Sequence, residues 1–240
     1  MILAGVDLAW QSERNPSAIA QGTLLNGTLL VTAVDKFVFG INAILERLRT
    51  DLSGIAIDAP LIIKNISGQR PCERDVGIAY GSKGASCHSS STSLFPDAQS
   101  VCLSRKLFEK GFDHLGEKRW QIECYPHPAI IEMFGLPWRL KYKRGLVSEK
   151  RAGQQKLASY IRKLEGSASL AFIVSDPYSE FLNEDFIAEL KGRDLKANED
   201  ALDSLICLYV AGLYAVGSQK RQCFGDKNTG YIWVPVGSCI

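Results

Sequence analysis

The apolar pattern of the N-terminal region predicts three strands. Apolar runs cover residues 1–9, 17–25 and 28–37, and each is short and bounded by polar or turn-forming residues. Asn26–Gly27 separates the second run from the third. This dipeptide favours a type I′ turn, because both central residues of that turn need positive φ. We therefore expect a β-meander of three antiparallel strands.

A helix and a fourth strand follow the meander. Residues 40–52 place their apolar side chains on one helical face, and residues 55–60 form another apolar run. A helix between two strands implies a crossover, so we expect the fourth strand to pair parallel with the first. Residues 61–118 are the least regular stretch, and we interpret residues 64–118 as a loop-rich insertion over one end of the sheet.

The second half of the chain predicts a fifth sheet strand, at residues 119–123, and several helices. Helical spacing predicts helices at 129–135, 148–166, 176–192 and 198–217, with Ser148 and Asn198 as N-caps, and residues 230–236 predict a last short strand. This order predicts one α/β domain over residues 1–240. Its core is a mixed five-stranded sheet with helices on both faces, which is the ribonuclease H-like arrangement.

The composition is ordinary for a globular protein and argues against several classes. The formal net charge is only +2, so the overall charge does not indicate a nucleic acid partner. The seven cysteines include no C-x-x-C pair, which argues against a disulfide framework and a zinc ribbon. The chain has no signal-peptide pattern and no apolar run of about 18 residues. We expect a cytoplasmic protein that contacts no membrane.

Acidic residues stand at the ends of three strands that we expect to be parallel neighbours. Asp7 ends the first strand, Asp58 the fourth and Glu123 the fifth. Adjacent strands lie about 4.8 Å apart, and ligands of open α/β sheets bind outside the carboxyl ends of the strands. The last predicted helix adds Asp200 and Asp203, whose spacing of three puts them on one side of it. We expect these acids to converge at one rim of the sheet.

Clustered carboxylates repel one another when ionised, and divalent cations relieve that repulsion. Mg²⁺ and Mn²⁺ prefer hard oxygen ligands, and two such ions together assist phosphodiester cleavage. We therefore predict a catalytic set of acids, most of which bind metal. The catalytic set is Asp7, Asp58, Glu123, Asp200 and Asp203, and the metal ligands are Asp7, Asp58, Asp200 and Asp203.

Most of these acids also have a structural interpretation, which the sequence leaves open. Asp58 lies two residues before Pro60 and suits a turn. Asp200 suits the positive end of a helix dipole, and Glu123 suits an ordinary salt bridge. A structural role is harder to explain for Asp7, because the run before it is apolar and a lone buried charge is costly.

Seven short motifs carry a resemblance to a known family. They are GVDLAW, AIDAPL, RPCERD, ECYPHPA, YKRG, DALDSL and GYIWVP, in this order from residue 5 to about residue 236. The chain resembles the domain-of-unknown-function 429 family, described as predicted nucleases with a ribonuclease H-like fold. A more distant similarity to RuvC-type Holliday-junction resolvases implies a metal-binding quartet of Asp7, Asp58, Asp200 and Asp203. Asp58 stands where those resolvases have Glu.

The most basic stretch, residues 138–151, interleaves cations with Trp138 and Tyr142. Cations that hold phosphates and aromatics that stack on bases suit a nucleic acid strand, although a solvated loop has the same composition. Arg70 and Arg74 follow the fourth strand and either face a phosphate or pair with acids. The predicted substrate-binding residues are Arg70, Arg74, Lys141, Lys143 and Arg144.

These features favour a Mg²⁺- or Mn²⁺-dependent nuclease that hydrolyses DNA or RNA. His127 is either a general acid or base of that reaction or a hydrogen-bonded structural residue. One alternative is an actin-like-fold ATPase or kinase, but residues 8–10 after the first acid contain no glycine for a phosphate loop. Another alternative is a binding module that keeps the fold without catalysis.

Overall fold

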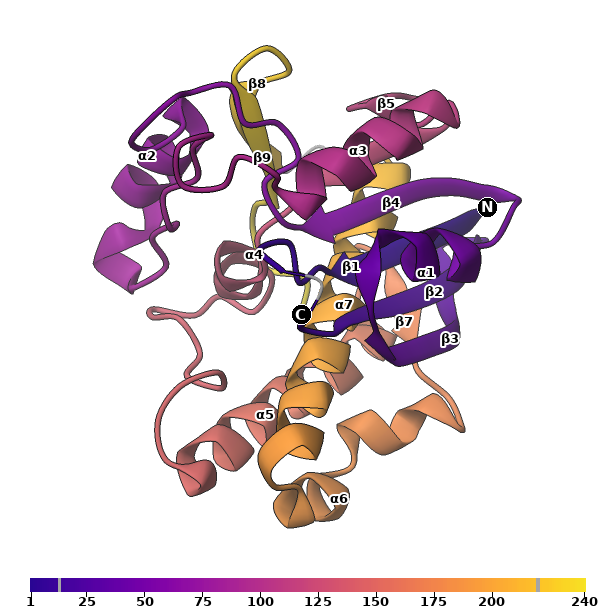
Figure 1. Cartoon of the computed structure of the whole chain (residues 1–240). Coiled ribbons are helices and arrows are strands. Elements are labelled where there is room, and N and C mark those ends of the chain that lie inside the picture. The colour runs from indigo at the N-terminus through magenta and orange to yellow at the C-terminus, as the bar shows by residue number, and fades with distance from the viewer. Residues whose placement is uncertain (13, 219–220) are drawn as a thin grey trace.

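One mixed sheet dominates the computed structural model, which describes residues 1–12, 14–218 and 221–240 (Figure 1). Its strands are β1 Ile2–Asp7, β2 Ser17–Leu25, β3 Thr28–Val38, β4 Leu52–Asp58, β5 Asp113–His114, β6 Trp120–Glu123 and β7 Ala171–Ile173. They lie in the order β5-β6-β4-β1-β2-β3-β7. β1, β2 and β3 pair antiparallel, β4, β6 and β5 continue parallel from β1, and β7 pairs parallel with β3.

The five predicted strands are present, but the predicted strand count is wrong. Asn26 and Gly27 have φ of 50° and 75°, as the expected hairpin turn requires, and β4 is parallel to β1. The sheet has seven strands and not five, because β5 and β7 extend it at its two edges. These edge strands are two and three residues long, which is too short for a period of two to mark them in the sequence.

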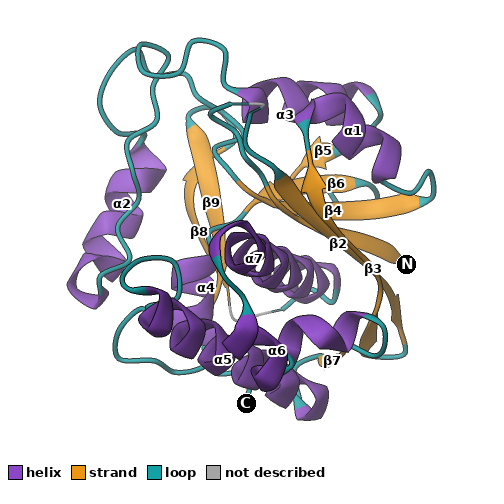
Figure 2. Cartoon of the chain, turned by 60° about the horizontal axis from the view of Figure 1, so that its bottom comes forward, coloured by secondary structure: helices purple, strands orange, loops and turns teal. Residues whose placement is uncertain are grey.

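Helices cover both faces of this sheet, as predicted (Figure 2). The α-helices of the described residues are α1 Gly40–Arg47, α2 Pro71–Tyr80, α3 Gln99–Glu109, α4 Pro126–Met133, α5 Val147–Lys163, α6 Glu184–Glu189 and α7 Gly192–Ala215. α1 and α3 cover one face, whereas α7 crosses the other face and packs against α4 and α5. No helix in the described part of the chain is long and apolar enough to cross a membrane.

A glycine lets α7 lie directly on β1. A Cβ atom at Gly5 would come within 2.0 Å of the backbone nitrogen of Leu208 and 2.4 Å of the backbone oxygen of Ser204. Only a residue without a side chain allows this approach. Asp7 lies on the same face of β1 as Gly5, because side chains alternate along a strand, and Asp203 directly precedes Ser204. The close contact therefore brings these two carboxylates together.

The position of Asn198 corrects one helix boundary that matters for the site. α7 begins at Gly192, and Asn198 is not its N-cap but a buried residue that donates a hydrogen bond to Gln154 Oε1. Asp200 consequently lies well inside the helix and not in its first turn. The helix-dipole interpretation of Asp200 is therefore wrong.

Two other predicted helices also differ from the expectation. α5 begins at Val147, so Ser148 lies inside its first turn and is not the N-cap. Residues 176–192 form a 3-10 turn at Tyr178–Leu182 and the short α6, separated by Asn183, instead of one continuous helix. Asn183 caps α6, because its side chain accepts two backbone N–H groups of the first turn.

A separate hairpin packs beside the insertion. β8 (Arg221–Asp226) pairs antiparallel with β9 (Gly230–Pro235), and α2 packs against both strands. β9 is the predicted last strand, whereas the sequence does not indicate β8, because Phe224 is its only buried residue. The stretch 64–118 contains α2 and α3 and is more regular than its composition suggests.

Candidate metal centre

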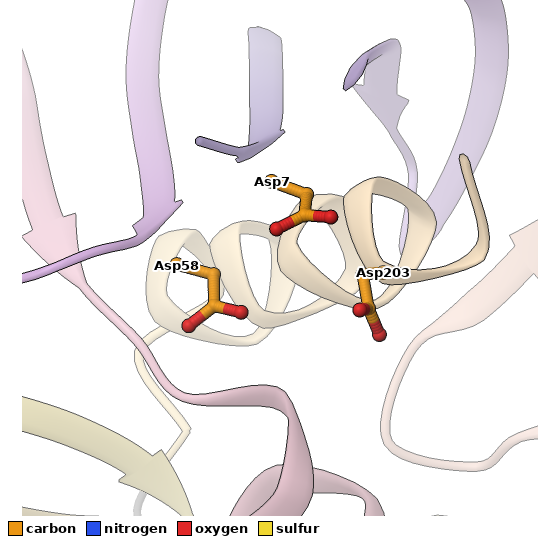
Figure 3. A group of neighbouring side chains, drawn as sticks. All are labelled: Asp7, Asp58 and Asp203. Atoms are coloured by element: carbon orange, nitrogen blue, oxygen red, sulfur yellow. The ribbon is translucent and has the colours of Figure 1, made fainter. Parts of the chain in front are cut away.

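Three aspartates from three separate elements meet at one rim of the sheet (Figure 3). Asp7 and Asp58 are direct partners in the register of β1 and β4, so their side chains point to the same face. That face is covered by α7, which supplies Asp203. One carboxylate oxygen from each residue lies within 4.8 Å of the other two. The structure thus brings these three predicted acids together.

Burial changes the protonation of two of these carboxyl groups. Burial, followed by the charge of Asp203, raises the pKa of Asp7 well above its usual value. Burial also raises the pKa of Asp58 to about 7, although the nearby ammonium of Lys143 opposes the shift. Within the described residues, no group donates a hydrogen bond to either side chain. A cation would stabilise the ionised form of both.

Asp203 is fully buried, and both of its carboxylate oxygens have partners. The hydroxyl of Tyr142 donates to Oδ1 at 2.6 Å, and the ammonium of Lys143 lies 2.5 Å from Oδ2. Burial alone would lower the pKa of Lys143, but Asp203 and the neighbouring charges outweigh it and raise this pKa well above its usual value. Lys143 is therefore the counter-charge of the cluster. This position differs from its predicted role as a contact to the substrate.

Glu123 ends β6 at the same rim of the sheet as Asp7 and Asp58, but its side chain lies on the other face of the sheet. It pairs in register with Ile57, one residue before Asp58, and side chains alternate along a strand. Its carboxylate accepts hydrogen bonds from Arg70 at 2.5 and 2.9 Å and from the Leu61 N–H at 2.8 Å. The expected convergence of Glu123 with the aspartates is wrong, and the salt-bridge interpretation describes it.

Arg70 is held by acids, which is the alternative that the sequence left open. Its buried guanidinium bridges Glu123 and Glu73, at 2.9 Å from the second carboxylate. Glu73 also accepts hydrogen bonds from the backbone N–H and the hydroxyl of Ser90, which fixes the loop after α2. Arg74 is exposed on α2 and does not line the cavity around the aspartates. The expectation that these two arginines face a phosphate is not supported.

Asp200 lies beside the cluster and has its own partner. Its carboxylate is 2.5 Å from the ammonium of Lys196, which is also 2.8 Å from Glu199. The charge of Asp200 helps to raise the pKa of Asp7, but its carboxylate is not among the three that converge. The predicted quartet is therefore a group of three aspartates with a fourth acid paired one turn away.

A cavity of about 840 Å³ is lined by Asp7 and Asp58 and joins them to the basic stretch. Its lining includes Arg139, Lys141, Lys143 and Arg144 from the predicted basic segment, together with the aromatic residues Trp10, Tyr125 and Tyr142. His127 also lines it, and burial, assisted by the charge of Lys143, lowers the pKa of His127 to about 3. His127 is consequently neutral near pH 7.

One partner of the site is not evident from the sequence, and a second is indicated by a single signal. The composition around Tyr142 suggests base stacking, whereas its hydroxyl in fact orients Asp203. Lys196 stands four residues before Asp200, and this spacing is the one signal that predicts their ion pair on a helix. No sequence signal links residue 142 to residue 203, because that contact depends on the path of the loop before α5.

The comparisons with known proteins place the chain in a family. A sequence model described as "Protein of unknown function (DUF429)" matches residues 5–229. The chain belongs to this family. The matched region of this DUF429 protein contains the three aspartates and the whole basic stretch. No curated protein and no solved structure matches the chain.

Proposed function

We propose that this DUF429 protein is a Mg²⁺- or Mn²⁺-dependent nuclease that hydrolyses phosphodiester bonds of DNA or RNA. The observation that carries the proposal is the convergence of Asp7, Asp58 and Asp203, with carboxylate oxygens within 4.8 Å. The ammonium of Lys143 balances only one of these three charges. The remaining repulsion is what a divalent cation relieves, and Mg²⁺ and Mn²⁺ prefer oxygen ligands of this kind.

The donor set fits such an ion. Asp7 and Asp58 offer oxygens that receive no hydrogen bond from the described residues. Asp203 is engaged by Tyr142 and Lys143, so a two-metal site requires the ammonium of Lys143 to leave Oδ2. When bound, the metal would supply Lewis acidity to the phosphate and lower the pKa of water near it.

The side chains of the protein itself have separate tasks in this proposal. Arg139, Lys141 and Arg144 line the same cavity and hold the phosphate oxygens of the substrate. Tyr142 fixes the orientation of Asp203 through its hydroxyl. His127 has a pKa of about 3 and is neutral near pH 7, so it shapes the cavity and is not the proton donor of the reaction.

The arrangement of the sheet supports a ribonuclease H-like fold as part of the proposal. β3, β2, β1, β4 and β6 are consecutive in the sheet, and the first three are antiparallel and the last three parallel. Asp7 and Asp58 end two adjacent strands of this set. β5 and β7 are short additions at its edges. Fold by itself does not establish function, so the site carries the argument.

A cleavage screen tests the proposal. Purified protein is incubated with Mn²⁺ or Mg²⁺ and labelled single-stranded, duplex and branched DNA and RNA, beside the variants Asp7→Asn and Asp75→Asn. Asp75 is an exposed aspartate on α2 and serves as the matched control. We expect metal-dependent cleavage that Asp7→Asn lowers at least ~1,000-fold, or about 4 kcal/mol of transition-state stabilisation. Equal cleavage by both variants, at unchanged circular dichroism, would refute the assignment.

A further inference from the structure

The cavity around the aspartates is of a size that suits a single strand. Its volume of about 840 Å³ falls within the range of ~300–1,000 Å³ that is usual for pockets holding small ligands. The major groove of B-DNA alone is about 12 Å wide, so a duplex is much larger than such a pocket. Asp7 and Asp58 line this cavity, and Asp203, which converges with them, has no exposed surface. A reacting phosphate must therefore enter the cavity and cannot be presented from the outer surface of a duplex.

Contacts between the cavity walls hold it at this size. The backbone N–H of Arg139 donates to the Lys83 carbonyl at 2.9 Å, and the hydroxyl of Tyr125 donates to the Ser86 carbonyl at 3.1 Å. Trp138 lies against Gly84, where a Cβ atom would come within 2.7 Å of the indole ring. These contacts tie the segment 83–86 to the segment 138–139 and to Tyr125. Opening the cavity far enough for a duplex would break them.

Three cations of the cavity lining are not paired with an acid, although Glu149 also lines the cavity and accepts a hydrogen bond from the Leu146 N–H. In the described part of the chain, no ion pair is formed by Arg139, Lys141 or Arg144. Lys143, in contrast, forms an ion pair with Asp203. All three lie on the short segment 139–144, beside the group of aspartates. Unpaired cations next to a metal-binding carboxylate group suit a ligand that carries phosphates in succession.

Aromatic side chains of the lining complete the pattern. Trp10, in the loop after β1, packs edge to face on Phe95 with ring centroids 4.5 Å apart, so its orientation is fixed. Tyr125 also lines the cavity, and its orientation is fixed because its hydroxyl donates a hydrogen bond to the Ser86 carbonyl. Ring faces held in this way stack on unpaired bases, which a duplex keeps inside its own stack.

We propose that the cavity binds one unpaired strand of nucleic acid, with its phosphates against Arg139, Lys141 and Arg144 and a base against Trp10. This assignment rests on the proposed nuclease function for the chemistry at the aspartates. Strand binding itself is separable from cleavage, because the cations and aromatics that bind the strand are different residues from the three aspartates. Single-stranded DNA and RNA share the chemistry that is recognised.

Fluorescence anisotropy with the full-length Asp7→Asn variant tests strand binding without cleavage. The probes are one 5′-labelled 12-nucleotide sequence as single-stranded DNA, as single-stranded RNA and as a blunt duplex. We expect at least ~10-fold tighter binding of a single strand than of the duplex. Comparing the affinities of the single-stranded DNA and RNA probes shows whether the cavity prefers deoxyribose or ribose. Equal or tighter duplex binding, or no binding of either single strand, overturns the proposal.

Charge and stacking variants in the same background locate the binding surface. Lys141→Gln with Arg144→Gln should lower single-strand affinity at least ~10-fold and reduce the slope of log affinity against log salt by about 1.4, since each phosphate that is no longer neutralised removes about 0.7. Lys110→Gln with Lys118→Gln, two exposed positions outside this cavity, is the matched control. Trp10→Leu should lower affinity at least ~5-fold without changing the salt slope. Unchanged binding in both sets of cavity variants overturns the assignment.

Cleavage and single-strand binding are measured separately, so the loss of one does not imply the loss of the other. Single-strand binding without metal-dependent cleavage by the wild-type protein removes the nuclease function and keeps the binding site. Metal-dependent cleavage of duplexes with no activity on single strands keeps the nuclease function and overturns the inference about the substrate.

Discussion

Two groups of acids line the same cavity, and they are balanced in opposite ways. Glu73 and Glu123 share the guanidinium of Arg70, and both also accept backbone N–H groups. Asp7 and Asp58 receive no hydrogen bond from the described residues, and their cluster holds a single ammonium, paired with Asp203. The glutamates are satisfied by the protein itself, whereas the aspartates are left to bind something positively charged.

The difference follows from one residue of strand register. Asp58 pairs with Asp7, so these two acids share the face covered by α7. Glu123 pairs with Ile57 and belongs to the other face, where Arg70 is available. Acids at the same sheet rim therefore have different tasks, and proximity along the rim does not identify a metal ligand.

The largest expected effect on stability is at the balanced group. Arg70→Met should lower the free energy of unfolding by about 3–5 kcal/mol, because it leaves two buried glutamates without their cation. Urea unfolding followed by circular dichroism measures this loss. Arg74→Met, on the same helix but exposed, should change the value by less than ~0.5 kcal/mol. A small effect of Arg70→Met would mean that the two groups do not differ as described.

The unbalanced group should respond to pH. The pKa of Asp58 is about 7 without metal, and that of Asp7 is also raised, mainly by burial. Protons therefore compete with metal below pH 7, and the affinity for Mn²⁺ should fall about 10-fold from pH 8 to pH 6, or ~1.4 kcal/mol. Isothermal titration calorimetry at both pH values checks this.

The same shift has a consequence for the metal-free protein. The folded state keeps a proton on Asp58 that the unfolded chain releases above about pH 4, so the contribution of this proton to stability is lost as the pH rises from about 4 through 7. Without metal, the melting temperature of Asp58→Asn should fall less over this range than that of the wild type. An identical pH dependence in both proteins would contradict the raised pKa of Asp58.

A smaller effect is expected at Lys143, the counter-charge of the aspartates. Lys143→Met frees Oδ2 of Asp203 and removes a positive charge from the site, so the affinity for Mn²⁺ should rise by up to ~10-fold. Calorimetry measures the affinity and also shows whether a second ion binds. Lys196→Met, which removes the partner of Asp200, is the informative comparison, because that carboxylate lies outside the converging group. Weaker binding in Lys143→Met would show that the lysine supports the metal site instead of competing with it.

Much of the sheet followed from local patterns. The Asn26–Gly27 turn, the crossover to β4 and the acids that end β1 and β4 all depend on short stretches of sequence. The approach of α7 to β1 also has a local cause, since Gly5 has no side chain. The positions that depend on register or on distant partners were not predictable in this way.

Glu123 and Asp200 illustrate what the sequence could not decide. Glu123 ends its strand as Asp58 does, but the offset of one residue between β4 and β6 is set by packing along the whole pair. Asp200 lies on the same helix as Asp203, but Lys196 lies one turn before Asp200 and forms an ion pair with Asp200. In both cases a cation supplied elsewhere by the chain determines which acid remains available.

The position of a bound Mn²⁺ ion shows whether the aspartates, and not the glutamates, form the metal site. Crystals soaked in Mn²⁺ and measured near the manganese absorption edge reveal the ion by its anomalous scattering. We expect an anomalous peak beside the carboxylates of Asp7 and Asp58, and none beside Glu73, Arg70 and Glu123. A peak at the glutamates, or no peak at the aspartates at millimolar Mn²⁺ and pH 8, would contradict it.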